Sequence, residues 1–364
     1  MRSGIATLPL HRGTTPKWLF KRMIALGREI GKVVFEEYGR DEFLSRISNP
    51  FWFQAFACVL GFDWHSSGTT TVTCGALKEA FDIKQHGIAV CGGKGKTARR
   101  ALEEIEKIGI EANMNNEKIE KIKYASKMTA KVDSAAIQDG YELYHHVLLL
   151  TDDGNWAVVQ QGMDKENNYA RRYHWLSKNV NSFVLEPHEG IAGIKRIEKT
   201  LDMTAKQSLE AQKISVDIVR DKPKKLMGFV IETKKKQRSL LEYTGEKYLF
   251  MPNRINWKLL KEIYEYQPKN YEELIGFKGC GATTIRALAL VSELIYGSPP
   301  SWEDPVKFSF AHGGKDGLPY PVNKKLMDET IEILRNGIEE AKIGNREKIN
   351  AIARLNNFIP RKSI

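Results

Sequence analysis

The chain has 364 residues, of which 42 % are hydrophobic, and it carries a formal net charge of +11. This length allows two or three domains, and the basic surplus favours an anionic partner, nucleic acid above all. Its four cysteines contain no CxxC pair, which excludes a zinc cluster and a secreted disulfide framework and favours the cytoplasm. We expect neither a signal peptide nor a membrane span, because no stretch has the required apolar length. The oligomeric state is left open.

Residues 1–100 predict helices that lead into a polar, glycine-rich region. A helix is expected from about Pro16 to Tyr38, because proline suits a first turn and Gly39 suits the end. Asp63 and His65 precede a Ser/Thr-Gly run that opens a further helix. After a short strand and a glycine-rich turn, three residues at a helix start are placed to hold a phosphate, Lys94, Lys96 and Thr97. A solvated basic turn is the alternative interpretation of these three.

Two β-rich segments, Tyr141–Leu150 and Trp156–Met163, flank an Asp-Asp-Gly-Asn sequence and predict a hairpin. The predicted register places His146 opposite Gln161. Strand alternation then puts one polar set on a single face, Glu142, Tyr144, His146 and Gln161. The segment that leads into the hairpin adds three more polar residues, Lys131, Asp133 and Asp139.

The next part of the chain combines cations with aromatic residues and then becomes strongly basic. Arg171 and Arg172 lie in the sequence YARRYHWL, a mixture that suits phosphate and base contacts. Residues 196–253 are rich in lysine and arginine, and we interpret them as a basic helical connector.

The stretch Glu273–Gly297 predicts two helices joined by a tight turn. Gly279 and Gly281 bracket Cys280 where a side chain would clash, and glycine permits a positive φ there. Free amide groups at the start of the second helix are a ready site for a phosphate. We expect a helix-hairpin-helix that binds a nucleic-acid backbone through Lys278, Gly279, Gly281, Thr283 and Thr284. The alternative is a glycine turn between two helices with no ligand.

The predicted fold class is α+β. Residues 1–195 are expected to form a domain of helices around a small, mostly antiparallel sheet that carries the polar cluster. Residues 196–253 form the connector, and residues 254–364 form an all-helical domain that contains the hairpin. A long loop in this last domain holds Asp304.

Several segments give the chain a family resemblance. PFWFQAFACVLGFDWHSSGTTT, KVDSAAIQDGYELYHH and DPVKFSFAHGGKDGLPYPV resemble, as parts of a nearly end-to-end likeness, an archaeal and bacterial family termed domain of unknown function 763. This resemblance implies no particular activity. The hairpin also resembles that of base-excision DNA glycosylases, which implies a catalytic role for Asp304. Residues 282–284 lack the lysine of the bifunctional members, which puts lyase chemistry in doubt.

The acids and histidines of the N-terminal region favour phosphodiester hydrolysis. The expected catalytic set is Asp63, His65, Lys131, Asp133, Asp139, Glu142 and His146. Three of these, Asp133, Glu142 and His146, are the expected ligands of Mg²⁺ or Mn²⁺, which would activate a water molecule. The leading hypothesis is a metal-dependent nuclease of DNA repair or recombination, although the sequence does not distinguish DNA from RNA. The alternatives are a glycosylase that uses Asp304 and a nucleic-acid-binding protein without catalysis.

Overall fold

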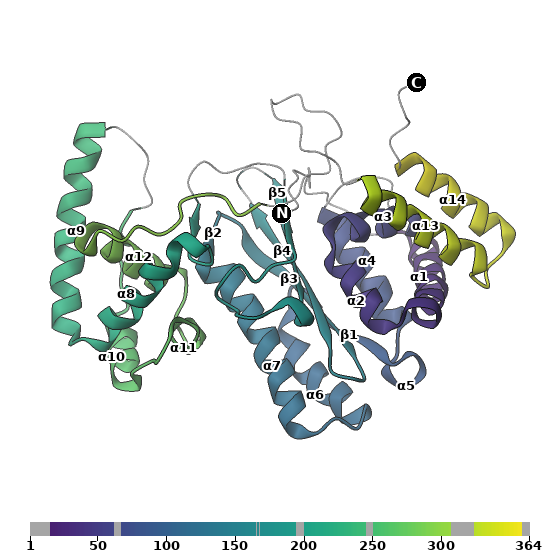
Figure 1. Cartoon of the computed structure of the whole chain (residues 1–364), viewed down its shortest axis with the longest axis horizontal. Helices are drawn as coiled ribbons and strands as arrows, with labels where there is room; N and C mark the ends of the chain where they lie inside the picture. Colours follow the sequence, from purple (N-terminus) through teal and green to yellow (C-terminus); the bar gives the residue numbers. More distant parts are fainter. Residues whose placement is uncertain are drawn as a thin grey trace.

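The computed structural model describes residues 15–61, 67–164, 166, 168–193, 200–244, 250–306 and 324–358. A five-stranded antiparallel sheet lies between helices on both of its faces (Figure 1). Its strand order is β1 (Ile88–Lys94), β3 (Glu142–Thr151), β4 (Trp156–Asp164), β5 (Tyr169–Leu176) and β6 (Gly190–Ala192). A second, two-stranded sheet pairs β2 (Ile137–Gln138) with β7 (Leu201–Asp202). The expected α+β class with a small antiparallel sheet is confirmed.

On one side of the sheet lies a group of helices from both ends of the chain. They are α1 (Lys17–Tyr38), α2 (Arg40–Ser48), α3 (Pro50–Leu60), α4 (Ser67–Ala80), α13 (Lys324–Glu340) and α14 (Asn345–Phe358). Of these, α13 and α14 pack on α1 and α3. The α3 helix begins where the Asn49 side chain accepts hydrogen bonds from the amides of Phe51 and Trp52. The Trp52 ring stacks on Phe56 at a centroid distance of 4.8 Å. The short α5 (Ile83–His86) then leads into β1.

The opposite face is covered by α6 (Ala101–Glu111) and α7 (Asn116–Lys131). A π-helical turn, Val132–Ala136, continues α7 toward β2. Further helices lie beyond α7, on the left in Figure 1: α8 (Leu209–Arg220), α9 (Pro223–Thr244), α10 (Trp257–Tyr266), α11 (Tyr271–Gly276) and α12 (Ala282–Tyr296). Short 3-10 turns occur at Ala98–Arg100, Ser177–Asn179 and Lys206–Ser208.

Successive strand residues are buried on opposite faces of the sheet. Val147 and Leu149 belong to the core formed with α1–α4, whereas Leu148 and Leu150 belong to the core formed with α7 and α12. Because both faces of the sheet are covered, the second half of β3 is a continuous run of apolar residues. Buried polar residues lie on both faces of the sheet near the start of β3, His145 on one face and His146 on the other.

The β3–β4 hairpin is one residue out of the predicted register. His146 lies opposite Gln160 instead of Gln161. Thr151 explains the shift, because its amide and hydroxyl bind the backbone of Asn155, so that the turn spans residues 152–154. A shift of one residue moves a side chain to the other face of a sheet. The expected single polar face is therefore wrong: His146 faces α7, and Gln161 faces α4.

Residues 254–364 pack in two separate places. The helices α10–α12 share a hydrophobic core with α7 and α8, whereas α13 and α14 pack against α1 and α3 on the other side of the sheet. The expected all-helical C-terminal domain is not confirmed, because its described helices do not share one core.

Candidate functional site

The turn 277–281 joins α11 to α12, as the sequence predicts. Gly279 has a φ of +91°, and an added Cβ would lie 3.1 Å from Leu259 Cδ1, so this position requires glycine. Gly281 is extended, with a φ of −145°, and the nearest atom to an added Cβ is 4.0 Å away. The clash expected at Gly281 is therefore absent. Cys280 is buried, which raises the pKa of its thiol to about 12.

The N-terminus of α12 opens into a groove with a volume of about 360 Å³. The groove lining includes Arg254, Asn256, Gly279, Gly281, Thr283 and Thr284. No side chain caps this helix start, and the amides of residues 282–284 have no hydrogen-bond partner within the described part of the chain. Uncapped amides and the helix dipole favour an anion at such a position. The exposed Arg254 adds a positive charge to the same groove.

Lys131 binds the turn between α11 and α12, although the sequence places it in the catalytic centre. Its ammonium group donates to the backbone carbonyl of Cys280, and burial lowers the pKa of this lysine. Gln138 in β2 provides a second link, because its side-chain amide donates to the Ala282 carbonyl at 2.8 Å. Lys131 and Gln138, the two ends of segment 131–138, thus both bind the start of α12 and the turn before it. The same segment carries Asp133.

Asp133 belongs to a buried hydrogen-bond chain on the α7 face of the sheet. The chain joins Ser126 to His146 at 2.8 Å, His146 to Gln160 at 2.9 Å, Gln160 to Asp133 at 2.5 Å and Asp133 to His188 at 2.5 Å. Burial lowers the pKa of His146, which favours a neutral ring, and it raises the pKa of Asp133. The neutral ring donates from Nδ1 to the Gln160 amide oxygen, so its Nε2 accepts the Ser126 hydroxyl proton.

Both carboxylate oxygens of Asp133 are occupied. Oδ1 binds His188, and Oδ2 accepts from Gln160 and from Trp175 Nε1 at 3.0 Å. The His188 ring packs on Trp175 at a centroid distance of 4.3 Å. A metal ion at Asp133 would displace at least one of these partners.

Asp139 and Asp304 share one buried arginine. Arg171 Nη1 donates to Asp139 Oδ2 at 2.8 Å, and the guanidinium binds both oxygens of Asp304 at 3.0 and 2.7 Å. The Tyr173 hydroxyl also donates to Asp139, and the Tyr141 ring lies 4.7 Å from the guanidinium carbon. The three charged side chains are at most 1 % exposed. Asp304 is thus an ion-pair partner, not the accessible aspartate of a glycosylase, and Arg171 has no surface for nucleic acid.

Arg172 lies on the opposite face of the sheet and is also fully buried. Its Nε donates to His174 Nε2 at 2.7 Å, and its guanidinium lies 4.5 Å from the centre of the Phe53 ring. Thr70 joins this cluster and donates to the Gln161 side chain at 2.5 Å. Arg172, like Arg171, is therefore a buried structural residue. The sequence places both on a nucleic-acid-binding surface, and this prediction is wrong.

A bulge in β3 places His145 on the same face as Arg172. The register shifts between Leu143 and His145, and the Tyr144 hydroxyl is hydrogen-bonded to Gln161. His145 is 2 % exposed, and within the described part of the chain neither of its ring nitrogens has a hydrogen-bond partner. Burial, then His146 and Lys94, lower the pKa of His145 to about 3.

The turn after β1 is basic and exposed. Lys94 and Lys96 are exposed, and Thr97 is half-buried without a side-chain capping bond. Gly95 has a φ of +59°, and its amide donates to the Tyr144 carbonyl at 2.7 Å. This geometry fits the solvated basic turn, and a phosphate at Lys94, Lys96 and Thr97 stays a prediction.

A family model described as "Protein of unknown function (DUF763)" matches residues 4–322. The chain belongs to the DUF763 family. The family resemblance read from the sequence is thereby confirmed, whereas the likeness to glycosylase hairpins stays a prediction. Neither the curated proteins nor the solved structures yielded a match. In the described ranges of this DUF763 protein, no helix has the length and apolarity needed to cross a membrane.

The DUF763 fold does not bring the predicted catalytic residues together. Asp133 and His146 are joined through Gln160, but Glu142 is exposed at the start of β3 and Lys131 binds the hairpin. Two of the predicted residues lie outside the described residues, Asp63 and His65. Among the described residues, no group of three His, Cys, Asp or Glu side chains is arranged to hold a metal ion. The predicted ligand set of Asp133, Glu142 and His146 is therefore not assembled in this conformation.

Three residues of the α12 groove and of the buried hydrogen-bond chain at Asp133 were not singled out from the sequence. Arg254 reaches the groove although it precedes the hairpin by a whole helix. Gln160 joins His146 to Asp133, a role that depends on the corrected register. His188 lies before β6 in a segment without regular secondary structure, and only its pairing with Asp133 distinguishes it.

Proposed function

We propose that this chain binds the sugar–phosphate backbone of nucleic acid, with DNA as the expected form, at the start of α12. The observation that supports the proposal is the groove, where uncapped amides of residues 282–284 lie beside Arg254. Gly279 and Gly281 keep side chains out of the turn, so a phosphate reaches the backbone. Amides and a cation recognise phosphate without reading bases. The net charge of +11 favours the same partner.

Replacing Arg254 with glutamine is expected to weaken binding to all sequences alike. Losing one phosphate contact makes the slope of log affinity against log salt shallower by about 1. Fluorescence anisotropy with labelled duplex and single-stranded DNA, over a series of salt concentrations, measures this slope. Lys258→Gln is the matched control, because Lys258 is exposed near the start of α10 but does not line the groove. Equal slopes for wild type and Arg254→Gln would contradict the proposal.

Metal-dependent strand cleavage is the second candidate function. The observation that favours it is the attachment of the hairpin to segment 131–138 through Lys131 and Gln138, because that segment carries Asp133. Mg²⁺ or Mn²⁺ would supply a Lewis acid and an activated water. Since Asp133 and His146 are both bonded to Gln160, this candidate requires the buried chain to open so that Asp133, Glu142 and His146 meet.

Cleavage is tested with labelled single-stranded, duplex and flapped DNA in Mg²⁺, Mn²⁺ or EDTA. A nuclease of this kind cuts directly and stops in EDTA, whereas a glycosylase needs no metal and leaves abasic sites that break in alkali. Glu142→Gln is expected to abolish cleavage and leave binding intact. Asp153→Gln in the exposed β3–β4 turn is the control. Cleavage that survives EDTA or Glu142→Gln would exclude this mechanism, and binding without any cleavage would favour the non-catalytic protein.

A further inference from the structure

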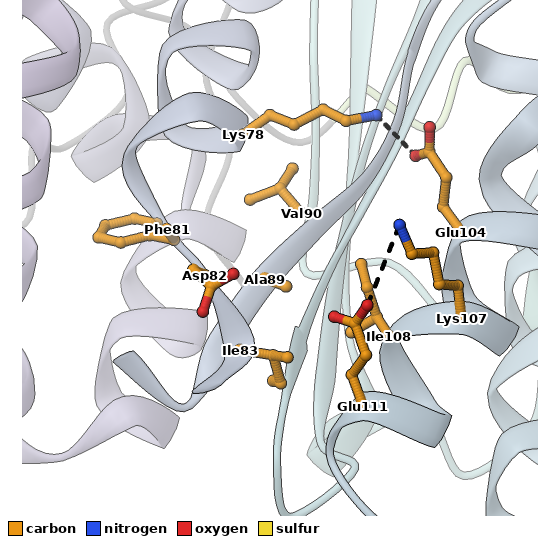
Figure 2. A pocket seen from close by; sticks show the side chains of 10 residues that line it. All are labelled: Lys78, Phe81, Asp82, Ile83, Ala89, Val90, Glu104, Lys107, Ile108 and Glu111. Carbon is orange, nitrogen blue, oxygen red and sulfur yellow. Dashed lines mark hydrogen bonds and ion pairs between the residues drawn. The ribbon is translucent and has the colours of Figure 1, made fainter. Parts of the chain in front are cut away.

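The outer edge of β1 faces a groove (Figure 2). Within the described residues β1 pairs only with β3. The Gly87 carbonyl accepts from the Asp152 amide, and the Gly95 amide donates to the Tyr144 carbonyl. The odd-numbered residues between them therefore bond toward β3, because an antiparallel ladder alternates. The amides and carbonyls of the even-numbered residues point outward, at Ile88, Val90 and Gly92.

At Gly92 the outward groups are already bonded. Glu104 accepts from the Gly92 amide at 2.7 Å, and Lys78 donates to the Gly92 carbonyl at 2.8 Å. These two side chains also form the 2.6 Å ion pair drawn in Figure 2. At Ile88 and Val90, no such partner is found among the residues that the structure describes. Val90 is only 3 % exposed, and backbone groups this deeply placed are nearly always paired in proteins.

The groove beside these unpaired groups is narrow and partly apolar. Its volume is about 210 Å³, below the roughly 300–1,000 Å³ of pockets for drug-sized ligands. Phe81 and Ile83 lie on one side of β1, and Ile108 of α6 lies on the other (Figure 2). An extended chain fits this combination, since it brings amides and carbonyls along one line and side chains to either side.

We propose that this groove binds an extended peptide segment of a partner protein, which adds to β1 as a further strand. The segment supplies a carbonyl and an amide to the outward groups of Ile88 and Val90, as in β-strand addition to other exposed sheet edges. Its successive side chains point alternately toward Ile83 and toward Ile108, which selects side chains with apolar surface on both faces of the segment. The Lys78–Glu104 pair blocks pairing beyond Gly92, so the added strand is short and its register is restricted.

A second copy of this chain is a poor occupant of the groove. Ala89 is 4 % exposed and Val90 3 %, so the strand edge is recessed between α5 and α6. Pairing two recessed edges would bring the flanking helices of both copies into collision. A peptide segment without flanking helices has no such conflict. The proposed interaction uses none of the residues of the α12 groove and does not depend on nucleic-acid binding.

Amide hydrogen exchange tests whether the edge is open. In the free protein, the Val90 amide is expected to exchange at least about tenfold faster than those of Ala89 and Cys91, whose amides bond to β3. Two-dimensional NMR of the ¹⁵N-labelled full chain measures all three. Equal protection at the three positions would show that the outward amide is already bonded and would overturn the proposal.

Peptide binding tests the occupant. The probe is an acetylated and amidated hexapeptide of alternating valine and threonine, titrated by NMR. Val90→Pro removes an outward amide without removing a hydrogen bond to β3, and proline is tolerable on an edge strand. It should weaken binding about tenfold, the value of one hydrogen bond near 1.4 kcal/mol. Val90→Ala keeps the amide and is the matched control.

A second version of the probe keeps the test valid if Val90→Pro fails to fold. Two further peptides are N-methylated on alternate residues, one at the odd-numbered positions and one at the even-numbered positions. Only the peptide whose methyl groups point toward β1 should lose binding. Binding that is insensitive to both N-methylated peptides, or no saturable binding of the parent peptide, would overturn the proposal. If the full chain forms dimers that Val90→Pro dissociates, the β1 edge pairs with a second copy, and this result would also overturn the proposal.

Discussion

Arg171→Leu is expected to lower the free energy of unfolding by about 3–5 kcal/mol, because it leaves buried carboxylates without their cation. Arg171 binds Asp139 through Nη1 and Asp304 through both terminal nitrogens. Both acids contact the same Nη1, so without the guanidinium two negative charges would face each other in a site that is at most 1 % exposed. The free energy of unfolding from urea titrations measures the effect.

An exposed arginine, Arg99, provides the control for this experiment. Arg99→Leu removes an arginine from the exposed turn before α6, and it should change stability by less than about 0.5 kcal/mol. Adding Asp304→Asn to Arg171→Leu removes one of the two stranded charges, so the double variant should recover part of the loss. A protein with Arg171→Leu that unfolds at the wild-type urea concentration would show that the ion pair is not buried as described. The same result would make Asp304 available again as a catalytic group.

Acid is expected to destabilise the wild type more than His145→Phe, by about 1.4 kcal/mol for each pH unit below 6.5. The pKa of His145 is lowered to about 3 in the folded protein by burial, with smaller contributions from His146 and Lys94. In the unfolded chain the ring titrates near 6.5. Between these two values the unfolded state binds a proton that the folded state does not, so this contribution to stability is present above pH 6.5 and is lost as the pH falls.

The pH series contains its own reference point. At pH 8 the imidazole is neutral in both states, so the difference between wild type and His145→Phe reports packing alone. Urea titrations of both proteins at pH 8, 6 and 5 then isolate the proton-linked part, because all other buried groups are common to the two. A difference in stability that does not change over this range would mean that the ring is solvated or has a hydrogen-bond partner.

Much of the local structure follows from short sequence patterns. The helix expected from Pro16 to Tyr38 is observed as Lys17–Tyr38, with Pro16 at its start. The two helices of the hairpin, the turn between them and the need for glycine at Gly279 also agree with the prediction. These features depend on neighbours a few residues apart, where the backbone preferences of proline and glycine and the helical spacing of apolar residues dominate.

The candidate site was harder to predict because it depends on strand register. The amino-acid pattern singled out Asp133, Asp139 and His146 as one predicted site, but a one-residue shift decides which face each strand side chain occupies. Thr151 closes the turn on Asn155, and Arg40–Asp152 and Asp41–Asn155 contacts hold that turn against α2. Those contacts join residues that are far apart in the sequence, so no local pattern contains them.

The sequence by itself determined the first helix, the two helices around the turn 277–281, the antiparallel β3–β4 strands and the basic charge that favours an anionic partner. Only the tertiary structure decided what the charged residues do. Arg171 reads as a nucleic-acid contact in the sequence, yet the fold surrounds it with Asp139 and Asp304. Arg254 shows no motif, yet the fold places it in the α12 groove. The physical reason is that burial and long-range pairing set the energy of a charge, and both depend on residues brought together from distant parts of the chain.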